Sequence, residues 1–207
     1  MMTLRSPAML PLIACTLVAQ SSDFRNTRWG MDRAQVVASE GTPPSQIRER
    51  GSETVLRYES ARLADLDCRV VYILAKDKLV RAKYVFQREH PAKNDFLADF
   101  TMVDAFLMAT MERPTEQRVM WRDEVYKMEP QHYGVAVSLG QLLYSTQWKG
   151  MRTVVTHALT GENGAITHEI EFVSVDLEPW EDQITKEQES PTGNPPRTLQ
   201  SAAAPPN

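Results

Sequence analysis

Two histidines near the end of the chain have a spacing that would let them do chemistry together. His157 and His168 lie on either side of Gly161-Glu162-Asn163-Gly164, a run of turn-forming residues between two strand-like segments. If Gly161 and Gly164 face each other across the turn, His157 lies directly opposite His168. Directly opposed side chains have Cβ atoms about 4.5–5.5 Å apart. The two imidazoles could therefore share a zinc or copper ion, given a third ligand.

Alternation along the two strands places both histidines on an apolar face, near the turn. That face also carries Val155, Leu159, Ile166 and Ile170, whereas the other carries Thr156, Thr167, Glu169 and Glu171. Two further interpretations stay open. The histidines form a partly buried, neutral pair at the rim of the core, or they form a pH-sensitive contact, because two protonated rings would repel each other.

Catalytic motifs are absent from the sequence. It contains no glycine-rich phosphate loop, no Gly-x-Ser-x-Gly elbow, no His-Glu-x-x-His and no Cys-x-x-Cys. Cys68 begins a strand-like run that ends at Leu74 and has no activating neighbour, so we expect a buried thiol and not a nucleophile. We therefore expect no catalytic residue, no cofactor and no enzyme activity.

Size and composition exclude several functional classes. With 207 residues, of which 42% are hydrophobic, the chain is long enough for a domain with a core and too apolar to be disordered throughout. A net charge of -4 excludes the broad basic surface of a non-specific nucleic-acid binder. Two cysteines cannot build a disulfide scaffold or a four-cysteine zinc site.

The first 19 residues have the pattern of an export signal. Arg5 precedes an uncharged, mostly apolar run from Ala8 to Ala19, which is too short to span a bilayer. Leu12-Ile13-Ala14-Cys15 resembles a lipobox and favours Cys15 as a lipidation site; the alternative is cleavage after Ala19 without a lipid. In both cases we expect an exported protein, either periplasmic or an outer-membrane lipoprotein that its lipid anchors to the membrane.

The rest of the chain divides into a domain and a tail. Residues 24–180 contain the periodic segments, in units of about 24–90 and 91–180. Residues 181–207 are rich in proline and poor in large apolar side chains, so we expect them to be disordered.

The first unit has the pattern of a short helix followed by strands. Asp32 is expected to cap a helix that ends at Gly41, before two prolines. Strands are expected at 54–58, 66–75 and 79–88, the last two joined by a turn at 76–78. On the last strand, one face is expected to carry Val80, Ala82, Tyr84 and Phe86, and the other Arg81, Lys83 and Val85.

The second unit has the pattern of a longer helix followed by further strands. Residues 94–111 carry apolar residues at helical spacing, namely Phe96, Phe100, Val103, Phe106 and Leu107. Three methionines of this segment, Met102, Met108 and Met111, are expected to fill the core. Strands are expected at 124–128, 133–139, 142–148, 151–160 and 165–175. The tryptophans Trp29, Trp121, Trp148 and Trp180 are either core and rim residues or an exposed aromatic patch.

This order of elements predicts an α+β fold. We expect an antiparallel β-sheet with helices on one face, arranged as two helix-plus-strands units.

Two short patterns resemble known exported families. The pattern Phe24-x4-Trp29-Gly30-Met31-x4-Val36, followed by Gly41-x-Pro43, is similar to the opening of small outer-membrane lipoproteins of the barrel-assembly machinery and of the β-lactamase-inhibitor-protein fold. The second half is similar to an uncharacterised exported bacterial family at Met111-Glu112-Arg113-Pro114, Trp121, Gly140, Trp148, Thr153 and the 151–175 hairpin, although Glu112 stands where that family has glycine. The resemblance implies a helix-plus-sheet repeat in an envelope protein.

We therefore expect an exported, non-enzymatic protein that acts by protein–protein interaction in the cell envelope. The sequence does not identify the partner. We expect no binding of nucleic acid. The alternative is a small-molecule or metal-binding module centred on His157 and His168.

Overall fold

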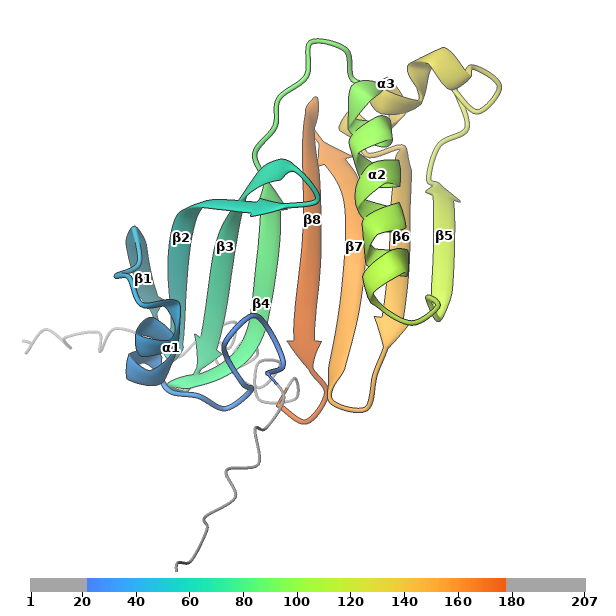
Figure 1. Ribbon diagram of the computed structural model, residues 1–207. Coiled ribbons are helices and arrows are strands. Elements are labelled where there is room, and N and C mark those ends of the chain that lie inside the picture. Colours follow the sequence, from blue (N-terminus) through green and yellow to red (C-terminus); the bar gives the residue numbers. More distant parts are fainter. Residues whose placement is uncertain (1–21, 178–207) are drawn as a thin grey trace, which may run out of the picture.

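An eight-stranded antiparallel sheet is the framework of the molecule (Figure 1). The computed structural model describes residues 22–177, so the export signal, Cys15, Trp180 and the 181–207 tail lie outside the described residues. The strands are ordered β1-β2-β3-β4-β8-β7-β6-β5, and every neighbouring pair is antiparallel. The predicted α+β class with an antiparallel sheet is confirmed.

A helix followed by four strands occurs twice along the chain. The first half contains α1 (Arg33–Glu40), β1 (Gln46–Arg50), β2 (Glu53–Leu63), β3 (Leu66–Ala75) and β4 (Lys78–Phe86). The second contains α2 (Asp95–Thr110), β5 (Glu116–Trp121), a short 3-10 helix (Pro130–His132), α3 (Tyr133–Ser138), β6 (Leu142–Lys149), β7 (Thr153–Glu162) and β8 (Ala165–Ser174). The last strand of each half, β4 and β8, pair in the middle of the sheet.

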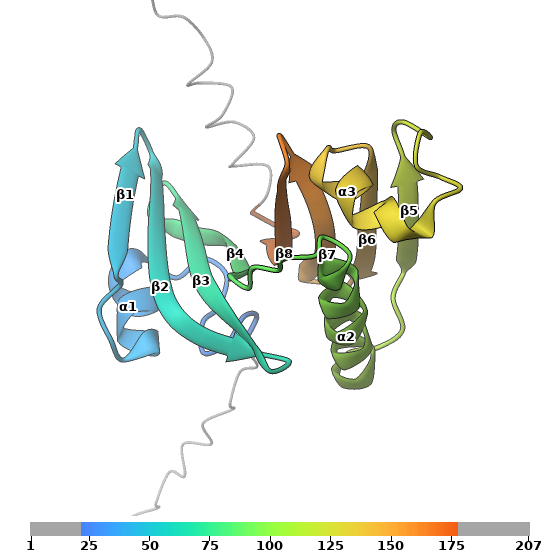
Figure 2. The ribbon, with the colours of Figure 1, turned by 90° about the horizontal axis from the view of Figure 1, so that it is seen from above.

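Both longer helices cover the same face of the sheet (Figure 2), as the sequence predicted. Val36 of α1 packs into a cluster with Leu56 and Tyr72 of the first half. Val103 and Leu107 of α2 pack into another, which contains Phe86, Trp148 and Ile170 from strands of both halves. No helix within residues 22–177 is long and apolar enough to span a membrane.

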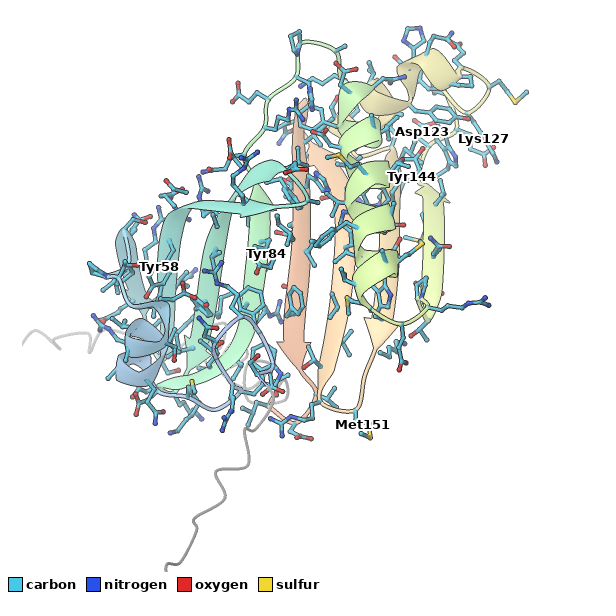
Figure 3. The ribbon with its side chains drawn as sticks, viewed as in Figure 1. Tyr58, Tyr84, Asp123, Lys127, Tyr144 and Met151 are labelled. Carbon is cyan, nitrogen blue, oxygen red and sulfur yellow. The ribbon has the colours of Figure 1, made fainter. Side chains whose placement is uncertain are left out.

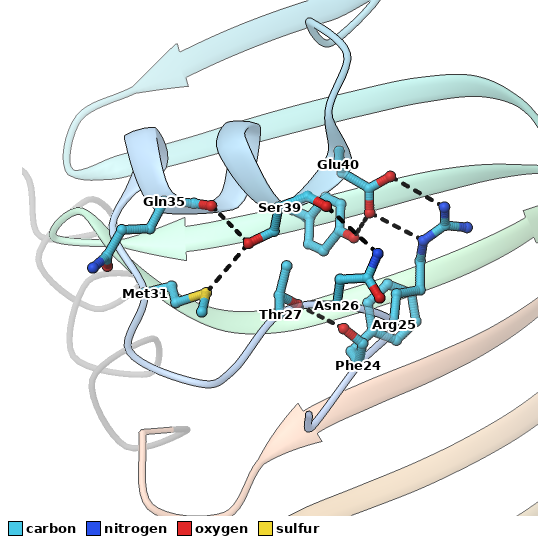
Figure 4. Close-up of polar contacts among 9 residues, drawn as sticks. Phe24, Arg25, Asn26, Thr27, Met31, Gln35, Ser39 and Glu40 are labelled. Carbon is cyan, nitrogen blue, oxygen red and sulfur yellow. Dashed lines mark hydrogen bonds and ion pairs between the residues drawn. The ribbon is translucent and has the colours of Figure 1, made fainter. Parts of the chain in front are cut away.

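The segment before β1 forms as the sequence predicted. Asp32 and Gln35 make a reciprocal capping box at the start of α1, and Gly41 ends the helix at a φ of 70°. Arg25 then clamps the helix end, because its guanidinium donates two hydrogen bonds to Glu40, at 3.0 and 3.1 Å (Figure 4). The Tyr72 hydroxyl donates to the same carboxylate, which ties α1 to the sheet.

One expectation about α2 is wrong. Met102 and Met108 do not fill the core but are exposed to solvent, because they lie off the stripe that contains Phe100, Val103 and Leu107. Asn94, which precedes the helix, makes no side-chain hydrogen bond to its first turn. Its amide instead donates to the Pro130 carbonyl and its side-chain oxygen accepts from the Gly134 N–H, so Asn94 ties α2 to α3.

Several strand predictions were also wrong. Residues 124–128 form a turn, and residues 133–139 form α3 and its C-cap although Val135 and Val137 favour strands. Pro130 starts the preceding 3-10 helix, and burial of Ala136 and Val137 against Leu142 and Leu159 stabilises the helical turn. The edge strands β1 and β5 were not expected, because β1 is polar and fully exposed and β5 is exposed at its four central residues.

A bulge in β4 changes one predicted face. The β3–β4 register shifts between Ile73 and Leu74, and this rotates Val80 away from Ala82. Val80 packs with Ala75 and Leu177 in a small separate cluster, while Leu79 joins the core beneath α1.

Candidate functional site

The turn between β7 and β8 fixes where the two histidines lie. Asn163 and Gly164 have φ values of 52° and 83°, as in the two-residue type I′ turn that Asn-Gly favours. Glu162 therefore pairs with Ala165, and His157 lies opposite Ile170 while His168 lies opposite Leu159. The predicted direct opposition of the histidines is wrong by this shift in register, and they are diagonal neighbours on one face.

Gly161, expected at the edge of the turn, lies within β7 and serves another purpose. A Cβ atom at Gly161 would be 2.1 Å from the carbonyl oxygen of Val137, so only glycine lets α3 approach the strand this closely.

The two histidine rings are in direct contact in the core. Their Nε2 atoms are 2.8 Å apart, which is a hydrogen-bond distance. His157 is 0% exposed and His168 is 4% exposed. The sequence predicted that these two side chains meet on an apolar face, and the structure brings them together there.

Asp104 of α2 completes a chain of three polar side chains. Its Oδ1 lies 2.9 Å from Nδ1 of His157, while its Oδ2 accepts hydrogen bonds from Thr146 at 3.1 Å and from Gln117 at 3.2 Å. Sequence reasoning missed Asp104. The signal was present, because an acidic residue stands between Val103 and Leu107 on the buried stripe of the helix.

The partners assign a direction to the protons in this chain. The Asp104 carboxylate only accepts hydrogen bonds, so Nδ1 of a neutral His157 carries its proton. The Nε2 of His157 then has a lone pair, and His168 donates to it from its own Nε2. Nδ1 of His168 is left with a lone pair and forms no hydrogen bond with any residue in the described range 22–177.

Aromatic packing keeps these rings out of water. Phe100 stacks on His157 with ring centroids 4.1 Å apart, and Phe86 lies against His168 at 4.2 Å. Burial and, to a smaller extent, the neighbouring His157 lower the pKa of His168 to about 3. Burial also lowers the pKa of His157, although the hydrogen bond and the charge of Asp104 oppose the shift. Both rings are therefore neutral at pH 7.

The two ends of this hydrogen-bonded chain of side chains, His168 and Asp104, line different cavities. His168 lines a cavity of about 790 Å³ beneath the connection between β4 and α2. Asp104 lines a second cavity, of about 340 Å³, between α2 and β6, whose wall includes Phe100 and Tyr144. Tyr144 lies beside α2 in Figure 3. The chain from Asp104 to His168 thus runs through the core from one cavity to the other.

A metal site at the histidines has no third ligand in residues 22–177. No group of three or more histidine, cysteine, aspartate or glutamate side chains in this range is arranged to hold a metal ion. The Nε2 atoms of His157 and His168 also point at each other, which uses the lone pair of His157 for a hydrogen bond.

The other residues singled out in the sequence have structural roles. Cys68 is fully buried, and burial raises the pKa of its thiol to about 11, so the thiolate nucleophile is disfavoured. The indole of Trp148 is buried and donates to the Glu112 carbonyl, and that of Trp29 donates to Thr153. Trp29 and Trp121 are half-buried, so these three tryptophans are core and rim residues.

Comparisons with protein-family models, with curated proteins and with solved structures found no match to this chain.

Proposed function

We propose that this chain is an exported, non-enzymatic protein that binds another protein of the cell envelope through the open face of its sheet. The observation that carries the proposal is the extent of that face. It runs across all eight strands opposite α1 and α2, and no helix within residues 22–177 covers it (Figure 2). A face of this width is large enough for a standard protein–protein interface.

The chemistry of the open face favours an acidic partner. Its β1–β4 half carries six basic side chains, namely Arg48, Arg50, Arg57, Arg69, Arg81 and Lys83. At the seam with β8, Lys83 lies 2.8 Å from Glu171 and 3.2 Å from Glu169, so this part of the face is internally paired. Arg69 of β3 is also paired, with Glu59 at 3.1 Å. Complementary charge would therefore act mainly through β1 and β2, where it gives specificity and a faster association rate.

The cellular location is part of the same proposal and is supported by residues 1–19. The basic residue, the apolar run and the lipobox-like Leu12-Ile13-Ala14-Cys15 favour export and a lipid anchor on Cys15. The intact mass of the mature protein distinguishes the alternatives. A diacylated Cys15 supports the anchor, an N-terminal Gln20 supports soluble cleavage, and a retained Met1 contradicts export.

Photocrosslinking from the open face tests the proposed interaction. A photoreactive residue in place of Val55 is expected to give a discrete adduct with an acidic envelope protein in living cells. The same residue in place of Ala98, exposed on α2, is expected to give none. Arg48→Glu should remove the Val55 adduct, because it reverses a charge on the open face, whereas Arg113→Glu, just after α2, should leave it intact. Equal adducts from Val55 and Ala98 would contradict the proposal.

A second candidate is a small-molecule-binding module centred on His157 and His168. The observation that favours it is the cavity beside His168, whose volume lies in the range of ligand sites.

A further inference from the structure

The cavity beside His168 is built where β4 and β8 separate. The two strands pair only from Arg81 to Val85 of β4, and the chain then leaves the sheet as the 87–94 connection to α2. This connection and the Asn163-Gly164 turn border the space, which has apolar walls at Phe86, Phe96 and Ile166.

The charged side chains that line this cavity are mostly basic. Arg69, Arg88 and Lys93 line it, against a single acidic residue, Glu89. Arg69 donates to Glu59 through Nε, and Arg88 donates to Asp99 through Nη1. A guanidinium has five N–H donors, so each arginine keeps donors for a ligand after making these contacts. The lining itself is therefore net basic, with two of its three cations also paired with Glu59 and Asp99 outside the lining.

His168 is the buried polar group on the wall of this cavity. Its Nε2–H is engaged with His157, so Nδ1 is the ring nitrogen left for a ligand. An anion brought in by the arginines would be repelled by the lone pair of Nδ1 unless Nδ1 takes up a proton. With the proton, His168 donates a charge-assisted hydrogen bond to the anion, and Asp104 compensates the charge through His157.

We propose that this cavity binds a small molecule through a carboxylate or phosphate-type oxyanion, and that His168 takes up one proton from solvent as the anion binds. The inference deepens the second candidate function and is independent of the partner on the open face. Arg88 and Lys93 attract the anion, protonated His168 donates to it, and the apolar wall accommodates the remainder of the molecule.

The groups that face His168 decide how the site depends on pH. They are Arg69 from β3, Arg88, Glu89, His90 and Lys93 from the 87–94 connection, Asp99 and Asp104 from α2, and His157 from β7. His90 is the histidine of the 87–94 connection, and its Nε2 is 2.6 Å from Asp99. Because burial lowers the pKa of His168, its ring is neutral in the ligand-free protein. A bound anion would stabilise the protonated ring and so raise that pKa.

Calorimetric titration of the full mature chain with sulfate tests the proposal, since sulfate does not itself titrate between pH 5 and 7. At constant ionic strength we expect affinity to rise on acidification, by up to about tenfold for each pH unit, the limit for one coupled proton. Titrations in buffers of different ionisation enthalpy should show the uptake of up to one proton per sulfate. Phosphate and succinate titrations then show whether the natural ligand class is a phosphate or a carboxylate.

Matched variants assign the effect to its groups. Arg88→Gln should weaken sulfate binding at least fivefold, and Arg113→Gln, outside the cavity, should not. His168→Gln should bind sulfate without proton uptake, whereas His90→Gln should keep the uptake.

Three outcomes overturn the proposal. The first is that none of sulfate, phosphate and succinate binds. The second is that proton uptake is lost in His90→Gln and kept in His168→Gln. The third is that the affinity for sulfate is unchanged in Arg88→Gln. If the protein binds zinc but no oxyanion, and zinc binding is lost in His168→Gln, the oxyanion site is overturned but the second candidate function, a small-ligand module, stands.

Discussion

Replacing Asp104 with alanine is expected to lower the free energy of unfolding by about 3 kcal/mol at pH 7. Asp104 is 8% exposed, and its carboxylate accepts hydrogen bonds from His157, Thr146 and Gln117. Alanine would leave the buried Nδ1–H of His157 and the hydroxyl of Thr146 without their acceptor, and a cavity in the place of the side chain. Chemical denaturation followed by tryptophan fluorescence measures the change.

Asp104→Asn is the matched control, because it keeps the shape of the side chain. Its amide oxygen still accepts from His157, and the Thr146 hydroxyl can rotate to accept from the amide N–H. We therefore expect a loss smaller than that of Asp104→Ala. Equal stability of Asp104→Ala and the wild type would show that the hydrogen-bonded chain contributes nothing to the fold.

Acidification from pH 7 to pH 5 is expected to destabilise the protein by about 2 kcal/mol through His168, at up to about 1.4 kcal/mol per pH unit, with a further loss in the same direction through His157. Both histidines have a pKa below their ordinary value of 6.5 in the folded state. Below pH 6.5 the unfolded chain therefore binds protons that the folded chain does not, and stability falls with pH until the folded pKa is reached, about 3 for His168. Above pH 6.5 the two neutral histidines make their full contribution to the free energy of unfolding.

The pH window separates the histidines from the carboxylates. Burial alone would raise the pKa of Glu171, but Lys83 and Arg81 outweigh this and hold it below its ordinary value of 4.5, so the stability from that carboxylate is lost only at lower pH. His168→Gln should reduce the slope of the free energy of unfolding between pH 7 and pH 5. If the slope is the same in His168→Gln and in the wild type, His168 is not a group that takes up a proton on unfolding in this pH range.

The amphipathic parts of the fold could be predicted from the sequence. The β3–β4 and β7–β8 hairpins, the Asp32 cap and the long helix α2 follow from alternation, capping and period, because each lies at the boundary between core and solvent. The edge strands β1 and β5 could not be predicted in this way. β1 is exposed along its length and β5 at its four central residues, and pairing with β2 and β6 makes them strands.

The geometry of the candidate site was predictable only in part. The sequence indicates that His157 and His168 share an apolar face, but their relative position depends on which two residues form the turn. Both Gly161 and Gly164 are residues that turns favour. Gly161 is required instead by the close approach of α3, which is a tertiary contact that the local sequence does not reveal. Asp104 is 53 residues from His157 in the chain, and nothing local connects them.

The central claim is that Asp104, His157 and His168 form a directed chain of hydrogen bonds with neutral rings. Nitrogen NMR of the imidazole rings at pH 7 tests it most directly, because the chemical shifts report which ring nitrogens are protonated. We predict a proton on Nδ1 of His157, a proton on Nε2 of His168, and an unprotonated Nδ1 on His168. A positively charged ring at either position, or a proton on Nδ1 of His168 in the ligand-free protein, would contradict the account.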